Sequence, residues 1–368
     1  MEKNIFRKEL ASFRPYVPGK SIDEVQKEYG LQRIVKLASN ENPLGPSHMA
    51  IEEIRKQLET IHLYPDPASA SLRGKLSEQL DMPLDQIVVG NGGEQILLLV
   101  AQTFINEGDE AIMANVTFDM YASSVSFLGG VPVRVPLKEY KHDFEEFITR
   151  ITEKTKLIYV CNPNNPTGNI MTSEDIKYLV ERIPDDIVLI LDEAYYDYAT
   201  VNPDYPKSME ILKHRDNTII LRTFSKVAGI AGVRIGYAIT SKKIAESMTK
   251  IKPTFNVNRL AQAAAIGAID DLDHIKKTVE LNYKSMAIME DYFAEKGLKY
   301  IKSNANFILI DIGIDSRIIF EELMKRGIII RPGYNWGFDT WIRVSTGTLE
   351  QTKFFTEQLD EVIKQESC

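Results

Sequence analysis

The sequence has few cysteines, no cluster of positive charge and no long hydrophobic run. Only two cysteines occur, Cys161 and Cys368, so we expect neither a disulfide framework nor a metal site built on cysteine. No hydrophobic run reaches the roughly 18 residues of a membrane-spanning helix, and residues 1–10 lack the hydrophobic core of a signal peptide. We therefore predict a cytoplasmic protein with no metal ion and no membrane partner.

The charge balance is acidic, and the length allows two domains. The formal net charge is -8, and the acidic residues are dispersed along the chain, which is typical of a solvated surface. Since no basic block occurs, nucleic acid is not expected as a partner. The 368 residues, 44% of them hydrophobic, are enough to bury a substantial core.

Hydrophobic segments alternate with helical segments through the middle of the chain. Strands that are hydrophobic throughout and separated by helices indicate a mostly parallel sheet with helices on both faces. The expected fold is therefore α/β, with a large domain built on this sheet. The segments expected as strands are residues 86–89, 110–113, 132–135, 157–160, 187–191, 218–221 and 233–239.

The C-terminal part of the chain has a different pattern. Residues 259–297 predict a long helical stretch that is interrupted near 270–273, and short strands are expected at 307–311, 328–331 and 341–344. Strands and helices in this order indicate a smaller α+β domain. We predict an N-terminal arm at residues 1–44 that contributes to the small domain, a large domain at 45–250 and the small domain at 251–368.

Four polar loops directly follow predicted strands, and they begin at Gly90, Cys161, Asp192 and Thr223. In a parallel sheet, ligands bind beyond the carboxyl ends of the strands. We therefore expect the four loops to converge on one crevice.

Lys226 lies in the last of these loops, between two predicted strands, where an unpaired charge would be costly. It therefore needs a partner or a covalent use, such as a Schiff base with an aldehyde. Thr223, Ser225 and Arg234 supply two hydroxyls and a guanidinium that suit a phosphate. An amine beside a phosphate grip suggests pyridoxal phosphate, whereas a solvated loop lysine near an unrelated arginine is the alternative.

Asp192 follows the most hydrophobic predicted strand. A buried carboxylate without a partner is expensive, and the protonated ring nitrogen of pyridoxal phosphate would satisfy it. Taken alone, an aspartate at a strand end can equally cap a helix or form a turn.

Three motifs carry a resemblance to a known family: Asn164-Asn-Pro-Thr-Gly168, Asp192-Glu-Ala-Tyr195 and Ser225-Lys226 with Arg234. In order and spacing they resemble the motifs of the fold-type I aminotransferases, which depend on pyridoxal phosphate. Within that family the chain is most similar to the histidinol-phosphate aminotransferases. The supporting motifs are Arg14-Pro-Tyr16, Ala38-Ser-Asn-Glu-Asn-Pro43, Tyr64-Pro-Asp66, Cys161-Asn-Pro-Asn-Asn-Pro-Thr-Gly168, Leu191-Asp-Glu-Ala-Tyr-Tyr196 and Ile342-Arg-Val-Ser-Thr-Gly347.

The resemblance implies a cofactor role for each matched residue. Lys226 would bond the cofactor aldehyde and later carry the proton at the substrate Cα, and Asp192 would hold the ring nitrogen. Asn165 and Tyr195 would bond the phenolic oxygen, with Phe118 stacked on the ring. The phosphate would be held by Gly93, Glu94, Thr223, Ser225 and Arg234, and by Tyr64 from the second subunit of a homodimer.

The resemblance also implies a substrate site for an amino donor and a 2-oxo acid. Arg343 would clamp the substrate carboxylate beside Asn165, and Tyr16 and Arg331 would contact a distal phosphate. Two departures lie near this site: the run Val227-Ala-Gly-Ile230 replaces the usual aromatic residue and glycine, and residues 331–338 are unusually aromatic.

Four functions follow from the resemblance. The first is transamination between histidinol phosphate and 2-oxoglutarate in histidine biosynthesis. The aromatic segment keeps open a preference for phenylalanine or tyrosine, and related decarboxylases of phosphorylated amino acids in corrin biosynthesis share these motifs. The fourth is a ligand-binding regulator with the same fold, which requires an added DNA-binding segment longer than the short N-terminal arm.

Overall fold

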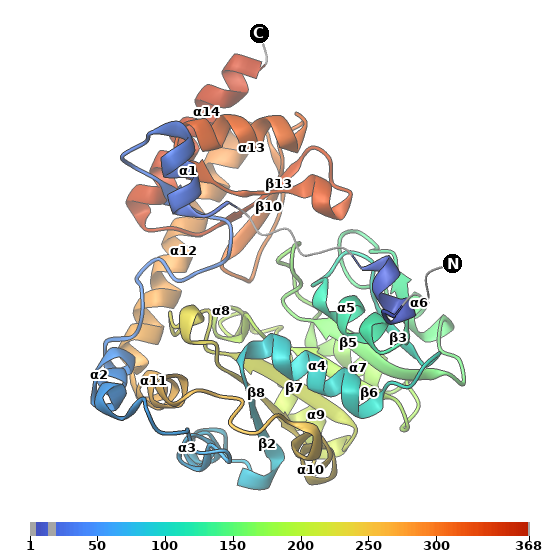
Figure 1. Cartoon of the computed structure of the whole chain (residues 1–368). Coiled ribbons are helices and arrows are strands. Elements are labelled where there is room, and N and C mark those ends of the chain that lie inside the picture. The colour runs from blue at the N-terminus through green and yellow to red at the C-terminus, as the bar shows by residue number, and fades with distance from the viewer. Residues whose placement is uncertain (1–4, 14–19, 367–368) are drawn as a thin grey trace.

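A seven-stranded sheet forms the centre of the larger part of the chain (Figure 1). The computed structural model describes residues 5–13 and 20–366. All neighbouring strands are parallel except β8, which runs antiparallel to both of its neighbours. The predicted α/β fold with a mostly parallel sheet is confirmed. The strand order is β2 (Ile87–Gly90), β8 (Gly236–Thr240), β7 (Thr218–Thr223), β6 (Val188–Asp192), β5 (Thr155–Cys161), β3 (Glu110–Ala114) and β4 (Val131–Val135).

Helices cover both faces of this sheet. In β5, Leu157 and Tyr159 point to one face while Ile158 and Val160 point to the other, and all four are fully buried. The first face packs against α4 (Gly92–Phe104), α5 (Met120–Phe127) and α10 (Lys242–Ile251). The cluster on the second face includes residues of α2 (His48–Gln57), α3 (Ala70–Leu80), α6 (Phe144–Thr149), α7 (Ser173–Val180), α9 (Ser208–His214) and α11 (Arg259–Asp270).

A second, antiparallel sheet lies in the C-terminal part, in the order β12 (Arg331–Pro332), β13 (Trp341–Ser345), β10 (Phe307–Asp311) and β9 (Lys299–Ile301). It packs against α12 (Leu272–Glu295), α13 (Ser316–Lys325) and α14 (Leu349–Glu366). The N-terminal β1 (Val35–Lys36) pairs with β11 (Ile328–Ile329), and α1 (Ile22–Tyr29) packs nearby. The domain boundaries at residues 44 and 250 stay predictions.

The short 3-10 helices are η1 (Lys8–Ser12), η2 (Leu58–Thr60), η3 (Leu84–Gln86), η4 (Ala231–Val233) and η5 (Gly333–Trp336). Across the two described ranges, no helix combines the length and hydrophobicity that crossing a membrane would take.

The carboxyl ends of β5, β6 and β7 meet at one edge of the large sheet. Cys161 is the cross-strand partner of Asp192, which in turn is the partner of Leu221. The segment 38–42 reaches this edge from the second sheet: the Asn40 backbone N–H donates to Ser345 Oγ, and Asn42 Nδ2 donates to the carbonyl of Val227. The two parts of the chain therefore meet beside the loop that carries Lys226.

A buried ion pair fixes the ends of β6 and β7 from behind. Arg222 Nη2 lies 2.8 Å from Glu193 Oε2, and only 9% and 1% of the two side chains are exposed. The hydroxyl of Ser208 donates to the other Glu193 oxygen. The Arg222 guanidinium lies 3.5 Å from the ring centre of Tyr196, at the start of α8 (Tyr196–Ala199).

Replacing Arg222 with methionine should lower the free energy of unfolding by about 3–5 kcal/mol, because it leaves a buried carboxylate without its cation. Urea unfolding followed by circular dichroism measures this loss. The matched control adds Glu193→Gln, which removes the charge but keeps an oxygen for Ser208, and it should recover much of the stability. An equal loss in the single and double variants would contradict the argument.

Candidate active site

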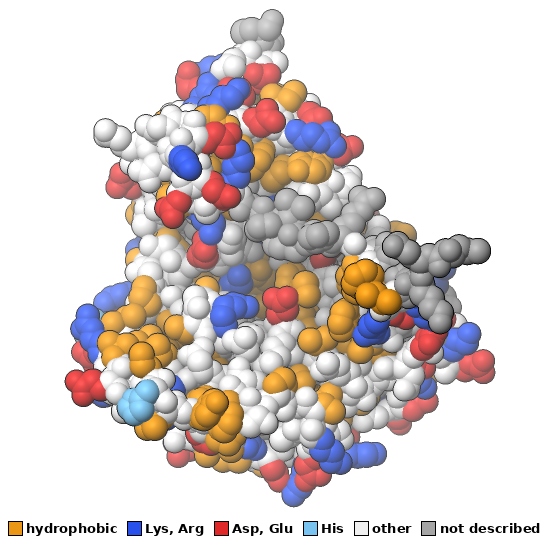
Figure 2. Space-filling view, in the orientation of Figure 1, with side chains coloured by type: hydrophobic (Ala, Val, Ile, Leu, Met, Phe, Trp, Pro, Cys, Tyr) orange, Lys and Arg blue, Asp and Glu red, His pale blue; other side chains and the backbone are white. Residues whose placement is uncertain are grey.

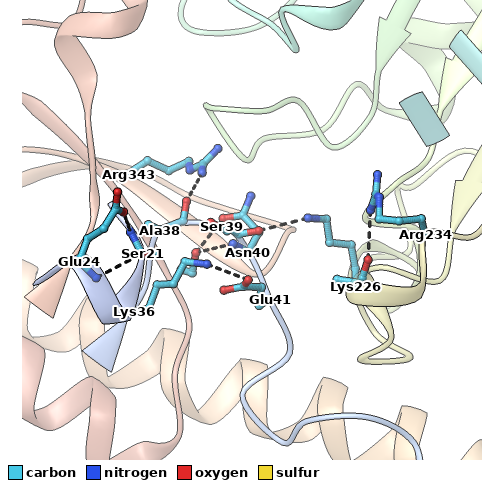
Figure 3. Close-up of polar contacts among 12 residues, drawn as sticks. Ser21, Glu24, Lys36, Ala38, Ser39, Asn40, Glu41, Lys226, Arg234 and Arg343 are labelled. Carbon is cyan, nitrogen blue, oxygen red and sulfur yellow. Dashed lines mark hydrogen bonds and ion pairs between the residues drawn. The ribbon is translucent and has the colours of Figure 1, made fainter. Parts of the chain in front are cut away.

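The edge of the large sheet brings Lys226 and Asp192 together with the segment 38–42. Asp192 is the last residue of β6, and Lys226 lies in the loop after the neighbouring β7. In Figure 3 Lys226 points toward Ser39, while Arg343 approaches the same segment from the opposite side. The place where Lys226 and Asp192 meet therefore also includes Arg343, from β13 of the second sheet.

Lys226 is half-buried, and its amine lies within the influence of two arginines, Arg343 and Arg234, and two carboxylates, Glu41 and Asp192. Its Nζ donates to the Ser39 carbonyl at 3.3 Å and lies 5.5 Å from the ring centre of Tyr195. Burial, followed by the charge of Arg343, lowers the pKa of Lys226 to about 8. An amine with this pKa is partly uncharged near neutral pH, so it can act as a nucleophile and as a base.

Asp192 holds a buried carboxyl group, and only 4% of the residue is exposed. Tyr121 Oη donates to Asp192 Oδ2 at 2.6 Å, and the backbone N–H of Ala194 donates to Oδ1 at 3.0 Å. Burial raises the pKa of Asp192 to about 6, against the effect of the Tyr121 hydrogen bond. The group is therefore ionised at neutral pH, and a cationic partner would stabilise it.

The start of α4 is built to hold an anion. Its N-cap residue, Asn91, makes no side-chain capping bond, so the amides of the first turn, including Gly93 and Glu94, are open to a ligand. Gly92 has a φ of +77°, and a Cβ there would lie 2.7 Å from Arg234 Nη2. Glycine at this position thus lets a guanidinium approach the helix start.

Two hydroxyl groups extend this cradle. Thr223 Oγ1, at the end of β7, donates to Ser225 Oγ at 3.0 Å, and both residues are half-buried. A cavity of about 500 Å³ adjoins the helix start, and Glu94 and Arg234 are among the residues that line it.

The predicted ring contacts lie beside Lys226 and Asp192. Tyr195 is 4% exposed, and its Oη accepts a hydrogen bond from Asn40 Nδ2 at 2.9 Å. Asn165 is half-buried, and its Oδ1 accepts a 2.5 Å hydrogen bond from Arg343 Nη1. Phe118 is half-buried and meets Tyr121 edge to face, with the ring centres 5.7 Å apart.

The two predicted substrate arginines are direct cross-strand partners, Arg331 on β12 and Arg343 on β13. Residues directly opposite each other in an antiparallel pair project from the same face of the sheet. Arg343 Nη2 also donates to the Ala38 carbonyl at 2.6 Å. Burial raises the pKa of Asp119, the residue after Phe118, and the charges of Arg134 and, to a smaller extent, Arg331 oppose that rise. The charge of Arg331 therefore acts on the region around Phe118.

Among the described residues, one predicted residue is not brought into this arrangement. Tyr64 is 78% exposed, and its ring stacks on Phe255 with the ring centres 4.5 Å apart. Tyr16 lies outside the described residues.

The groups present fit pyridoxal phosphate. Lys226 offers an amine of lowered pKa, Asp192 a buried carboxyl for the ring nitrogen, and the uncapped start of α4 a place for the phosphate beside Arg234. Placed at the carboxyl edge of a mostly parallel sheet, such a set defines the class of pyridoxal-phosphate enzymes of fold type I.

Comparison with known proteins agrees with this class. The family model of class I and II aminotransferases matches residues 32–359. The chain belongs to this family and is a pyridoxal-phosphate-dependent aminotransferase. Membership of this family supports an enzyme and not a ligand-binding regulator.

Individual relatives extend over nearly the whole chain. The histidinol-phosphate aminotransferase of Caldicellulosiruptor saccharolyticus is 43% identical over 98% of this chain and 100% of its own length. That of Moorella thermoacetica is 41% identical over 97% of this chain and 92% of its own length. The crystal structure of the Sinorhizobium meliloti histidinol-phosphate aminotransferase in complex with pyridoxal 5'-phosphate has a TM-score of 0.91 at 28% identity, and the match covers 99% of this chain and 98% of that one.

The sequence prediction missed Asn40 and Tyr121. Asn40 stands within the quoted motif at residues 38–43, so the motif gave a signal but no role. Tyr121 lies three residues after Phe118, in the first turn of α5. This helical spacing was the only signal available.

Proposed function

We propose that the protein transfers the amino group of histidinol phosphate to 2-oxoglutarate, giving imidazole acetol phosphate and glutamate. The observation that carries this proposal is the cross-strand pair of Arg331 and Arg343 at the site. Histidinol phosphate carries a phosphate dianion, and 2-oxoglutarate carries two carboxylates. A pair of guanidinium groups suits either substrate in turn, because arginine binds both kinds of oxyanion in a bidentate manner.

In the proposed reaction the cofactor, when bound, supplies an aldehyde that takes up the amino group and a ring that accepts electrons. Lys226 would hold the cofactor through its amine, and the same amine would move the proton at the substrate Cα. Its lowered pKa leaves part of the amine uncharged for this task. Asp192 holds a negative charge against the ring nitrogen.

The remaining residues hold and orient the cofactor and the substrate. The first-turn amides of α4, at Gly93 and Glu94, bind the cofactor phosphate together with Arg234. Thr223 and Ser225 add hydroxyl donors to the same phosphate. Asn165 and Tyr195 donate to the phenolic oxygen, and Phe118 covers one face of the ring. Tyr16 and Arg331 bind the distal phosphate of the donor.

A half-reaction tests the choice of donor. The holoenzyme is mixed separately with histidinol phosphate, phenylalanine and phosphothreonine, and the absorbance of the bound aldehyde is followed by stopped flow. We expect fast loss of this absorbance with histidinol phosphate and slow loss with phenylalanine. The reverse order would contradict the proposal, and release of carbon dioxide from phosphothreonine would indicate the decarboxylase.

One observation favours aromatic donors as a second candidate function. The ring centre of Trp336, in η5, lies 5.3 Å from the Arg343 guanidinium, and that of Phe307 lies 5.2 Å from it. An indole ring beside the carboxylate clamp can stack on the side chain of phenylalanine or tyrosine.

We further propose that two copies of the chain form a homodimer in which Tyr64 reaches the site of the partner. Figure 2 shows hydrophobic side chains gathered over α2 and the segment that follows it. Leu58, Ile61, Leu63 and Tyr64 of this stretch are between 49% and 78% exposed. A neighbouring set of exposed hydrophobic residues supports burial against another protein surface.

Mixing two defective variants tests this arrangement. If Tyr64 serves the partner, a dimer of one Lys226→Ala chain and one Tyr64→Ala chain contains one intact site. An equal mixture, unfolded and refolded together, should then recover roughly a quarter of the wild-type activity by random pairing. If Tyr64 serves its own chain, each site keeps a defect and mixing recovers nothing. Each variant refolded alone is the control.

A further inference from the structure

A chain of buried hydrogen bonds runs from the second sheet to Tyr195 through Asn40. Ser345, the last residue of β13, is 3% exposed, and Asn40 is 2% exposed. Ser345 Oγ donates to Asn40 Oδ1 at 2.8 Å, and Asn40 Nδ2 donates to Tyr195 Oη at 2.9 Å. In Figure 3 Asn40 lies between Arg343 and Lys226.

The bonds at Ser345 decide which way the Asn40 amide faces. The Asn40 backbone N–H donates to Ser345 Oγ at 2.9 Å, so this oxygen already acts as an acceptor. Its own hydrogen needs an acceptor because the group is buried, and Asn40 Oδ1 is the oxygen in reach. With its oxygen turned to Ser345, the amide presents its nitrogen to Tyr195.

This direction has a consequence for the tyrosine hydroxyl. Burial raises the pKa of Tyr195 well above its ordinary range, so the hydroxyl keeps its proton at neutral pH. An N–H of Asn40 occupies one lone pair of Oη, and Asn40 Nδ2 cannot accept the hydroxyl hydrogen. The hydrogen is therefore left to donate to another acceptor near Oη.

We propose that Asn40 is a positioning residue: its side-chain amide fixes the Tyr195 hydroxyl as a donor to the cofactor phenolic oxygen, and Ser345 fixes Asn40. This inference rests on the proposed role of Tyr195. It ties the direction of that hydroxyl to β13, the strand that also carries Arg343. The second sheet thereby orders a group that contacts the cofactor as well as one proposed to bind the substrate.

The sharpest test is Asn40→Asp. The two side chains have nearly the same shape, and both residues tolerate the left-handed backbone that Asn40 adopts, with a φ of 56°. An ionised aspartate can only accept, so the Tyr195 hydroxyl would turn toward it and away from the cofactor. The readout is the absorbance of the bound cofactor against pH, without any amino donor.

We expect the midpoint of this titration to rise by about 1 pH unit in Asn40→Asp, because a hydrogen bond donated to the phenolic oxygen weakens the hold of the adjoining Lys226 nitrogen on its proton. In a Tyr195→Phe background the same substitution should add a smaller rise, due only to the new charge. Ser345→Ala, which frees the amide to turn, should raise the midpoint in the same direction.

A wild-type midpoint in Asn40→Asp, or an equal rise with and without the Tyr195 hydroxyl, overturns the inference. If the aspartate variant does not fold or bind the cofactor, Ser345→Ala decides: a raised midpoint supports the proposal, and an unchanged one overturns it. An unchanged midpoint in Tyr195→Phe would instead contradict the proposed role of Tyr195. Because no amino donor is present, the outcome does not depend on which donor the enzyme uses.

Discussion

Replacing Lys226 with alanine should slow transamination by at least about 10⁴-fold, because one amine provides both the covalent hold and the proton transfer. The Lys226 amine reaches the Ser39 carbonyl and the ring of Tyr195, between the two sheets. The turnover number with histidinol phosphate and 2-oxoglutarate measures the effect.

The matched control for this prediction is Lys226→Arg. Arginine keeps the positive charge but stays protonated, so it can neither attack an aldehyde nor accept a proton near neutral pH. Both variants should be inactive while still binding the cofactor through the start of α4 and Arg234, which equilibrium dialysis would show. Borohydride treatment should label the wild-type peptide around Lys226 and neither variant. Turnover within tenfold of wild type in the alanine variant would remove Lys226 from the mechanism.

The sequence predicted the sheet well because its strands are buried on both faces. The expected strands at 157–160 and 187–191 correspond to β5 (Thr155–Cys161) and β6 (Val188–Asp192). A strand between two helical layers must be hydrophobic at every position, and this leaves an unambiguous run in the sequence. The same argument identified the polar residues at the strand ends whose burial without a partner would cost free energy, Asp192 among them.

The strand after Lys226 was predicted too early. The hydrophobic run suggested residues 233–239, whereas η4 occupies Ala231–Val233 and β8 begins at Gly236. The reason is Arg234, which adopts a left-handed backbone with a φ of 61° and so interrupts the extended chain. Residue composition does not reveal the left-handed backbone of Arg234. That conformation places the Arg234 guanidinium beside Gly92, at the start of α4.

The hydrogen bonds around Asn40 could not be predicted from local sequence. Asn40 and Ser345 are 305 positions apart, and neither residue has a helical or strand pattern that points to the other. Their contact depends on how β1 and β13 bring the N-terminal segment against the second sheet. Local patterns predict elements and buried charges, whereas pairings across the fold need the fold itself.

Replacing Asp192 with asparagine should lower the rate of the half-reaction with histidinol phosphate by about 10²–10⁴-fold. The amide keeps the shape, but its single oxygen can receive only one of the hydrogen bonds from Tyr121 and Ala194, and it carries no negative charge to hold the ring nitrogen. The loss should appear in the rate of proton removal from the substrate Cα, measured by stopped flow with donor deuterated at that carbon. An unchanged isotope effect and rate would contradict the assigned role.

Tyr121→Phe is the control that separates the charge of Asp192 from its surroundings. It removes the 2.6 Å hydrogen bond but leaves the carboxylate, so the rate should fall by no more than about tenfold. The bond favours the ionised form, and its loss should raise the pKa of Asp192 further above the value of about 6 that burial produces. Because a carboxyl group is protonated below its pKa, the Tyr121→Phe defect should be larger at pH 6 than at pH 8. A defect as large as that of Asp192→Asn at both pH values would mean that the packing around Tyr159 and Tyr121, not the charge, sets the rate.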